Sequence, residues 1–148
     1  IFARAGQLIK IADNLAIKIL YPFNKINGQS FAKTNETSVV AKAFYGKNTF
    51  LLTGDAEGAA ESSLIFGREN LKADVLQVAH HGSKNSTSGD FLKKVQPSAA
   101  VIQVGAKNRY GHPSVETLQR LEQAKILRTD LLGDISFECD LNNCRANY

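Results

Sequence analysis

The 148-residue chain contains no methionine, only two cysteines and only three histidines. Translation starts with methionine, so its absence even at position 1 leads us to expect a processed or excised piece of a longer protein. No apolar run approaches the roughly 20 residues that cross a bilayer, so no transmembrane segment is predicted within this chain. No basic run is long enough for a nucleic-acid-binding tail, and a net charge of +4 permits an anionic substrate without requiring one.

The remaining composition is that of a globular domain. Hydrophobic residues make up 43% of the chain and charged residues 22%, and this length is sufficient for one domain with a real core. The cysteines, Cys139 and Cys144, flank a turn-prone Asn142-Asn143 pair. A disulfide across a small loop and two free thiols therefore both stay open.

Hydrophobic periodicity predicts a mixed α/β sheet. Short alternating or apolar runs predict strands at 8–12, 15–20, 38–45, 48–53, 75–79, 99–104, 126–128 and 135–139, with a surface loop at 24–35. Helices are expected from Glu57 to about Phe66, from a capping box at Thr87 and Asp90 to about Val95, and from Pro113 to about Gln123. Antiparallel hairpins thus come first, and strands then alternate with helices.

Two of the three histidines, His80 and His81, directly follow the apolar run 75–79. Open α/β sheets place their chemistry beyond the carboxyl ends of such buried strands. Because side chains alternate along a strand, both imidazoles reach one site only if the chain bends, which Gly82 permits. The alternative is a pair of structural histidines at a strand end.

Asp55 and His112 also follow predicted buried strands. Asp55 could present a carboxylate to a metal ion or cap the helix that follows. His112 precedes Pro113, which suits the first position of a helix, and the helix dipole there favours a neutral imidazole; a simple cap is the alternative. If the three strands are neighbours, these groups converge on a site that suits zinc, manganese or iron. Side chains nearby that could hold an anionic oxygen are Ser83, Lys84, Asn108 and Arg109.

Three motifs, taken in order, resemble the second half of a metallo-β-lactamase-like domain. They are Thr53-Gly54-Asp55-Ala56-Glu57, then Ala73-Asp74-Val75-Leu76 leading into His80-His81-Gly82-Ser83 with Ser86-Thr87-Ser88, then Asn108-Arg109-Tyr110-Gly111-His112-Pro113. The branch that is most similar is the soluble domain of ComEC-type DNA-uptake (competence) proteins, in which Asn35-Glu36-Thr37-Ser38-Val39-Val40 resembles the segment before the aspartate strand. The resemblance covers nearly the whole chain.

The resemblance implies a role for each matching residue. Asp55 matches an aspartate that bridges two divalent metal ions, zinc or manganese, and His81 matches the late histidine ligand of the second metal. His80 would lie beside the bound phosphate or water, and His112 would be a substrate-side group, so that Asp55, His80 and His112 form the catalytic set. Which of His80 and His81 ligates stays open. Residues expected to shape the substrate pocket are Asn35, Ser83, Asn108 and His112.

The complete domain would be a metal-dependent hydrolase, a phosphodiesterase or nuclease that acts on DNA during uptake. Its metals would lower the pKa of a bridging water and stabilise the developing charge. The implied partners are DNA or another phosphodiester, the missing N-terminal half of the domain, and the membrane-embedded region of a parent bacterial membrane protein. This region would be a soluble domain of that protein, with an extracytoplasmic location as one option.

The sequence departs from the pattern of the metallo-β-lactamase-like family at two points. The main metal motif of the family, His-x-His-x-Asp-His, belongs to the first half of the domain and is absent, and Ser114-Val115 stand where another His-Pro is expected. Asp55 and His81 supply one or two ligands, whereas a catalytic zinc usually has three from the protein. We therefore expect residues 1–148 to be the second half of an αββα sandwich, with its inner sheet face partly uncovered and no activity by itself. The alternatives are a non-catalytic binding module of the same fold, and a hydrolase of another substrate such as a choline phosphoester or a lactone.

Overall fold

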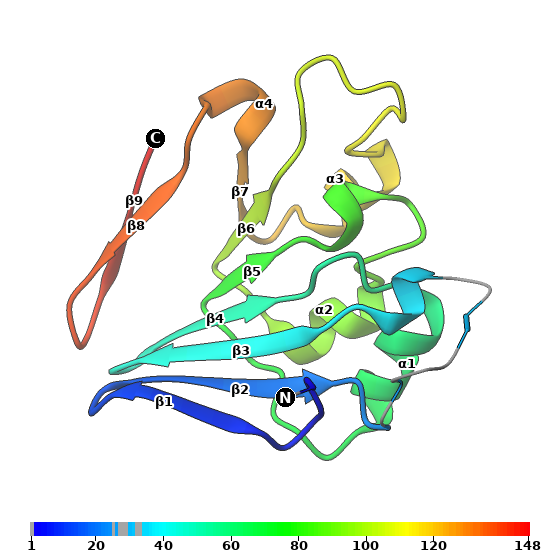
Figure 1. Ribbon diagram of the computed structural model, residues 1–148. Coiled ribbons are helices and arrows are strands. Elements are labelled where there is room, and N and C mark those ends of the chain that lie inside the picture. The colour runs from blue at the N-terminus through cyan, green and yellow to red at the C-terminus, as the bar shows by residue number, and fades with distance from the viewer. Residues whose placement is uncertain (1, 25, 27–29, 32–33) are drawn as a thin grey trace.

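The computed structural model of the chain describes residues 2–24, 26, 30–31 and 34–148 (Figure 1). The predicted loop at 24–35 lies partly outside these residues. The strands are β1 Leu8–Ala12, β2 Leu15–Tyr21, β3 Val40–Tyr45, β4 Asn48–Leu52, β5 Val75–Gln77, β6 Ala99–Ile102, β7 Lys125–Arg128, β8 Ser136–Cys139 and β9 Cys144–Asn147. The helices are α1 Gly58–Phe66, α2 Gly89–Val95, α3 Val115–Arg120 and α4 Thr129–Leu132, with 3₁₀ turns η1 at Thr34–Thr37 and η2 at Ala79–Gly82.

The predicted mixed α/β sheet is confirmed. Seven strands lie side by side in the order β1-β2-β3-β4-β5-β6-β7. The first four pair antiparallel, and β4 to β7 pair parallel. Tight turns at 13–14 and 46–47 join antiparallel neighbours directly, whereas parallel neighbours require crossovers, here through α1, α2 and α3. The carboxyl ends of β4, β5 and β6 therefore lie at one edge of the sheet.

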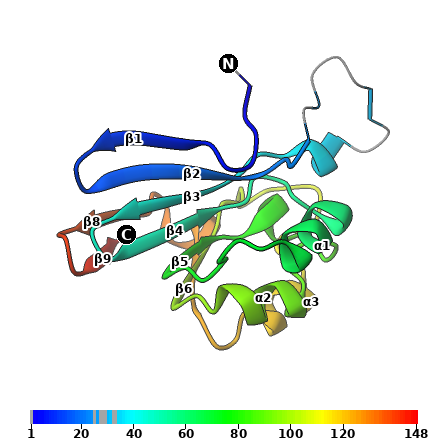
Figure 2. The ribbon, with the colours of Figure 1, turned by 90° about the horizontal axis from the view of Figure 1, so that it is seen from below.

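One face of the sheet packs against the helices. Leu51, Leu76 and Ala100 lie in register across β4, β5 and β6 and are fully buried. Helix α2 contributes Phe91 and helix α1 contributes Leu64 to the same core. Figure 2 shows α1, α2 and α3 gathered on this side. This packing places a continuous buried core beneath the sheet edge that carries the predicted site residues.

The opposite face of the sheet is also apolar but is only partly covered. Ile9, Ile17, Ala43 and Phe50 lie in register across β1 to β4. The ring of Phe137, from the β8–β9 hairpin, packs edge-on against Phe50 at 5.7 Å between centroids. Away from that hairpin the covering is incomplete, because Ile9 and Leu52 are 51% and 43% exposed.

The segment 135–139 does not join the main sheet, so this part of the prediction was wrong. It forms β8, which pairs with β9 in a separate two-stranded sheet. The tip of this hairpin is attached to the β3–β4 turn, since Lys47 N donates to Leu141 O at 2.8 Å and Asn48 Nδ2 to Asp140 O at 2.7 Å. A disulfide joins the directly paired Cys139 and Cys144, which settles the alternative left open by the sequence.

The helix starts also differ from the prediction. Ser88, not Thr87, caps α2 by accepting a hydrogen bond from Phe91 N. Pro113 precedes the cap of α3, which is Ser114, and the helix ends at Arg120 rather than near 123. Asp55 does not cap α1, because the capping position belongs to Glu57, whose side chain makes no capping hydrogen bond. The Asp55 and Glu57 carboxylates are thus available to the sheet edge.

Glycine is required at position 82 because two of the motif-bearing loops approach each other closely there. Its φ is +81°, and a Cβ atom there would lie 2.6 Å from Pro113 Cβ. Its carbonyl also accepts from Ser114 N at 2.9 Å. The loop after β5 and the loop before α3 are therefore in direct backbone contact.

We expect Gly82→Ala to lower the free energy of unfolding by at least about 1–2 kcal/mol, the cost of left-handed backbone for a residue with a Cβ, with the clash against Pro113 added. Urea unfolding measures this loss. The matched control is Gly89→Ala in α2, where a Cβ meets nothing within 4 Å and alanine is the better helix former by up to about 1 kcal/mol. Equal stability of the two variants would contradict the prediction.

Candidate metal and phosphodiester site

The predicted site residues lie together at the carboxyl edge of β4, β5 and β6. Asp55 follows β4, His80 and His81 follow β5, and His112 lies in the loop after β6. The ring centroid of His80 is 6.1 Å from that of His81 and 5.7 Å from that of His112. These residues converge because the three strands are parallel neighbours, which is the condition under which the sequence predicted convergence.

The chain bends at the histidines themselves and not only at Gly82. His80 has φ 48° and ψ 47°, and His81 has φ 55° and ψ 23°. The left-handed region is unfavourable for residues other than glycine, so surrounding contacts must maintain it. One such contact is the hydrogen bond from His80 N to Gly54 O, at 3.0 Å. The bend lets adjacent imidazoles both face the sheet edge.

Gln77, the last residue of β5, holds the loop that carries Asp55. Its Oε1 accepts hydrogen bonds from the backbone N–H groups of Thr53 and Gly54, at 2.8 and 3.0 Å. The Thr53 hydroxyl donates in turn to Gln77 O at 2.6 Å. The position of Asp55 relative to β5 is thereby determined by three hydrogen bonds, which the sequence did not reveal.

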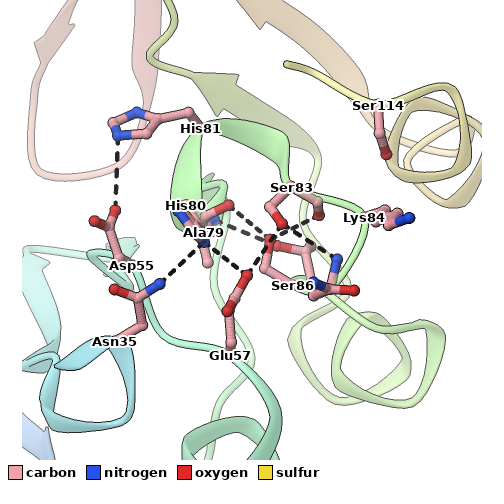
Figure 3. A network of polar contacts seen from close by, with 12 residues as sticks. Asn35, Asp55, Glu57, Ala79, His80, His81, Ser83, Lys84, Ser86 and Ser114 are labelled. Atoms are coloured by element: carbon pink, nitrogen blue, oxygen red, sulfur yellow. Dashed lines mark hydrogen bonds and ion pairs between the residues drawn. The ribbon is translucent and has the colours of Figure 1, made fainter. Parts of the chain in front are cut away.

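Asp55 and His81 form a pair of potential metal ligands. His81 Nε2 lies 3.8 Å from Asp55 Oδ1 (Figure 3). His81 Nδ1 lies 2.7 Å from the carbonyl oxygen of Gln103, so we assign the Nδ1 proton to that bond, which leaves Nε2 with a free lone pair. A backbone carbonyl that orients the second ring nitrogen is usual for metal-bound histidine. The donor types and their orientation therefore fit a zinc or manganese ion.

The set of ligands is incomplete for a catalytic metal. Within the described part of the chain, no three His, Cys, Asp or Glu side chains are grouped to hold a metal ion. Asp55 and His81 would therefore supply two ligands, where a catalytic zinc generally has three.

His80 is engaged by a carboxylate that the sequence did not single out. Its Nδ1 lies 2.6 Å from Glu57 Oε1. Because an ionised carboxylate only accepts hydrogen bonds, we assign the Nδ1 proton to this bond, which leaves Nε2 as the free nitrogen. Ser83 Oγ donates to the same Glu57 oxygen at 3.0 Å, and Asn35 Nδ2 lies 3.3 Å from His80 Nδ1 (Figure 3). Two residues expected in the substrate pocket, Ser83 and Asn35, thus contact this pair.

Burial by itself raises the pKa of the Glu57 carboxyl, but the hydrogen bonds from His80 and Ser83, with a smaller one from Asn35, outweigh it and lower the pKa overall. Glu57 is consequently ionised at neutral pH and able to hold the His80 proton. The only signal in the sequence was a second carboxylate two positions after Asp55.

The Asn108 side chain forms hydrogen bonds with the backbone around His112. Its Oδ1 accepts from His112 N at 2.9 Å, and its Nδ2 donates to His112 O at 2.8 Å and to Gly105 O at 3.0 Å. Asn108 therefore positions His112, and its role in shaping a substrate pocket stays a prediction. Lys84 lies on the far side of the loop, where its carbonyl accepts from Arg120.

The pKa of His112 lies below its ordinary value of 6.5, mainly because the ring is partly buried and also because the His80 and His81 imidazoles are close to it. The Glu57 carboxylate raises this pKa, but by less. The neutral state predicted from the sequence agrees in direction but not in cause. Helix α3 begins only at Val115, after its cap at Ser114, so His112 is not at a helix N-terminus.

We expect an NMR titration of His112 to give a midpoint below 6.5, because the folded environment disfavours the imidazolium ion. The unfolded chain takes up this proton first, so stability falls as pH drops from above about 6.5 towards the lower folded pKa, and then levels off. Urea unfolding over this pH interval should show a smaller pH-dependent fall in the free energy of unfolding for His112→Gln than for the wild type. A midpoint at or above 6.5 would contradict the assignment.

Comparison with known proteins connects these motifs to competence. The chain is 38% identical over 136 residues to ComE operon protein 3 of Bacillus subtilis, which covers 90% of this chain. It is 41% identical over 129 residues to competence protein ComA of Neisseria gonorrhoeae, covering 84% of this chain, and 42% identical over 113 residues to recombination protein 2 of Haemophilus influenzae, covering 76%. This chain is similar to segments of these three bacterial proteins, of which the Neisseria protein is named as a competence protein. It matches no protein-family model.

The chain spans only a small part of these relatives, namely 17% of the Bacillus protein, 18% of the Neisseria protein and 14% of the Haemophilus protein. The competence link predicted from the motifs is thus supported for this segment. None of the helices in the described part of the chain has the length and apolarity needed to span a bilayer.

Proposed function

We propose that this chain is the second half of a metal-dependent phosphodiester hydrolase domain that acts on DNA during uptake. The observation that carries the proposal is the Asp55–His81 pair, in which His81 Nδ1 contacts the Gln103 carbonyl and Nε2 faces Asp55 Oδ1 at 3.8 Å. Similarity to competence proteins supports DNA as the substrate, because competence is the uptake of DNA.

In this proposal Asp55 and His81 would hold a metal ion, and the chemistry that such an ion would supply is to make water a stronger acid at neutral pH. His80 keeps its Nδ1 proton on Glu57, so its Nε2 is directed at the phosphate or water, as a base or hydrogen-bond acceptor. His112 remains neutral at pH 7 because of its lowered pKa and lies beside His80 on the substrate side. Asn35 and Ser83 maintain the His80–Glu57 geometry.

Two observations support the half-domain part of the proposal. The pair Asp55 and His81 is short of a full catalytic set, and the sheet face away from the helices leaves Ile9 and Leu52 about half exposed. We propose that an N-terminal half supplies the His-x-His-x-Asp-His cluster, covers this face and completes a site for two divalent ions. The disulfide between Cys139 and Cys144 suits a domain that lies outside the reducing cytoplasm, carried by a membrane-embedded parent protein.

The incomplete donor set also favours a second candidate, a non-catalytic binding module of the same fold. The two candidates differ in metal content. A chain extended N-terminally by roughly one further half-domain should bind about two metal ions and cleave a phosphodiester, whereas the 148-residue chain should do neither with comparable efficiency.

Metal analysis and turnover of a DNA oligonucleotide and of a small phosphodiester, measured side by side, decide between them. If the extended chain is metal-free and inert, the hydrolase proposal is wrong and the binding module is the remaining candidate. Turnover by the 148-residue chain would overturn the half-domain part. Cleavage of a choline phosphoester or a lactone, without cleavage of DNA, would replace the substrate.

A further inference from the structure

A hollow of about 300 Å³ adjoins the Asp55–His81 pair. Its lining is largely apolar and aromatic, and ligand pockets range from roughly 300 to 1,000 Å³. The residues around it are His81, Gln103, Val104, Gly105, Asn108, Tyr110 and His112. Because His81 belongs to both, an occupant of the hollow would lie next to any metal held by the pair.

Aromatic rings form a series along this hollow. Tyr110 stacks on His112 with 6.0 Å between centroids and 21° between planes, and His112 continues to His80 at 5.7 Å. Tyr110 is 68% exposed although it is a large aromatic residue, and its loop projects beyond the sheet edge between β6 and α3 (Figure 1). The loop is held in shape by Asn108, so the exposed ring is presented at a defined position.

Cationic side chains flank this exposed ring. The guanidinium carbon of Arg109 lies 5.2 Å from the Tyr110 ring centroid, and Arg109 Nη2 donates to the Tyr110 hydroxyl at 3.1 Å. Lys107, in the same loop, is exposed. An exposed aromatic ring beside cationic side chains is the arrangement with which proteins bind single-stranded nucleic acid, through base stacking and backbone contacts.

We propose that the hollow is a nucleobase subsite, in which an unpaired base of single-stranded DNA stacks on Tyr110 while Arg109 and Lys107 meet the phosphates on either side. The subsite rests on the proposed function for the choice of DNA as ligand. It adds that the bound DNA is single-stranded and names the side chains that contact it. An unpaired base is needed because the faces of a paired base are already stacked within the duplex. Stacking uses the π-face that all four bases share, so binding tolerates any sequence. The scissile phosphate of the bound strand would then lie towards Asp55 and His81.

The chain contains no tryptophan, so Tyr110→Trp places a single fluorescent reporter in the subsite. The probes are a single-stranded oligothymidylate, an abasic oligomer of the same length and charge, and a duplex. All are added in EDTA, so that metal binding and cleavage play no part. The matched control is Tyr148→Trp, since Tyr148 is 56% exposed and also has a cation over its ring, Lys125 Nζ at 5.2 Å. Lys125 opens β7, at the opposite edge of the sheet from the site.

The oligothymidylate should quench the tryptophan at 110 and leave the tryptophan at 148 unchanged. Tyr110→Ala should weaken its binding by about 5- to 150-fold, which corresponds to one stacked base, and Tyr110→Phe should not. The wild-type chain should bind the abasic oligomer and the duplex more weakly by a similar factor.

Equal binding of the abasic oligomer and the oligothymidylate would overturn the proposal, because phosphate charge alone would then account for the affinity. So would equal quenching at positions 110 and 148, equal affinity for the duplex, or absence of any binding. These binding results would leave the hydrolase proposal unaffected, because that proposal is tested by the metal content and turnover of the extended chain. Conversely, an inert extended chain that still binds bases through Tyr110 would retain the subsite in a binding module.

Discussion

Asp55→Ala, introduced into the N-terminally extended chain, is expected to lose both bound metal and phosphodiester cleavage. Asp55 Oδ1 faces His81 Nε2 at 3.8 Å, and this pair is the metal-binding contribution that we propose for the present chain. Removal of an outer-shell partner of a metal ligand already costs about 10- to 100-fold in affinity or activity. Loss of the ligand itself should therefore reduce cleavage by at least about 100-fold.

The matched control for this loss is Asp90→Ala in the same extended chain. Asp90 is an exposed carboxylate in the first turn of α2 that pairs with Lys93 at 2.8 Å, away from the sheet edge. Metal content by elemental analysis and turnover at saturating metal should be unchanged in this control. If Asp55→Ala kept full metal content and wild-type turnover, Asp55 would not be a ligand and the assignment of this site would fail.

Glu61→Ala is expected to lower the free energy of unfolding by about 3–6 kcal/mol, the sum of two hydrogen bonds to a charged acceptor at about 1.5–3 kcal/mol each. Glu61 lies in α1 with 4% of its surface exposed. Its carboxylate accepts from the backbone N–H of Thr87 and from that of Ser88, the latter at 3.0 Å. Thr87 is buried with φ +53°, so alanine would leave a buried donor unpaired in a segment that is already unfavourable.

This loss should be visible as a lower urea midpoint with an unchanged slope. Glu61→Gln, which keeps one acceptor oxygen, should lie between the wild type and Glu61→Ala. Glu122→Ala, at an exposed position, is the control and should stay within about 0.5 kcal/mol of the wild type. A loss below about 1 kcal/mol in Glu61→Ala would mean that water replaces the carboxylate.

Glu61 also connects stability to the site. The segment that it holds contacts the start of the histidine turn, because Thr87 Oγ1 accepts from Ala79 N at 3.3 Å and Ser86 Oγ donates to Ala79 O at 2.8 Å. The left-handed backbone of His80 and His81 follows directly. The buried carboxylate of α1 thus supports the bend that directs both imidazoles to the sheet edge.

Local patterns were sufficient for most of the elements. Alternation in 8–20 and 38–53 determined two hairpins, since two-residue turns allow only antiparallel neighbours. Asp55, His80 and His112 each follow a buried strand, so they could be placed at one sheet edge on the condition that these strands are neighbours, which the structure meets. The helix starts were less predictable, because Thr87 and Ser88 both suit a cap, and in the structure it is the Ser88 hydroxyl that accepts from Phe91 N.

Sequence patterns were thus enough to predict the chain order of β1 to β8 and of α1 to α3, but not α4 or β9. Which side chains contact each other could be seen only in the folded chain. Glu57 contacts His80 across 23 positions and His81 contacts the Gln103 carbonyl across 22, and no local period encodes such pairs. The tertiary structure likewise decided that β8 leaves the main sheet, because the alternation of a strand specifies its faces but not its partner.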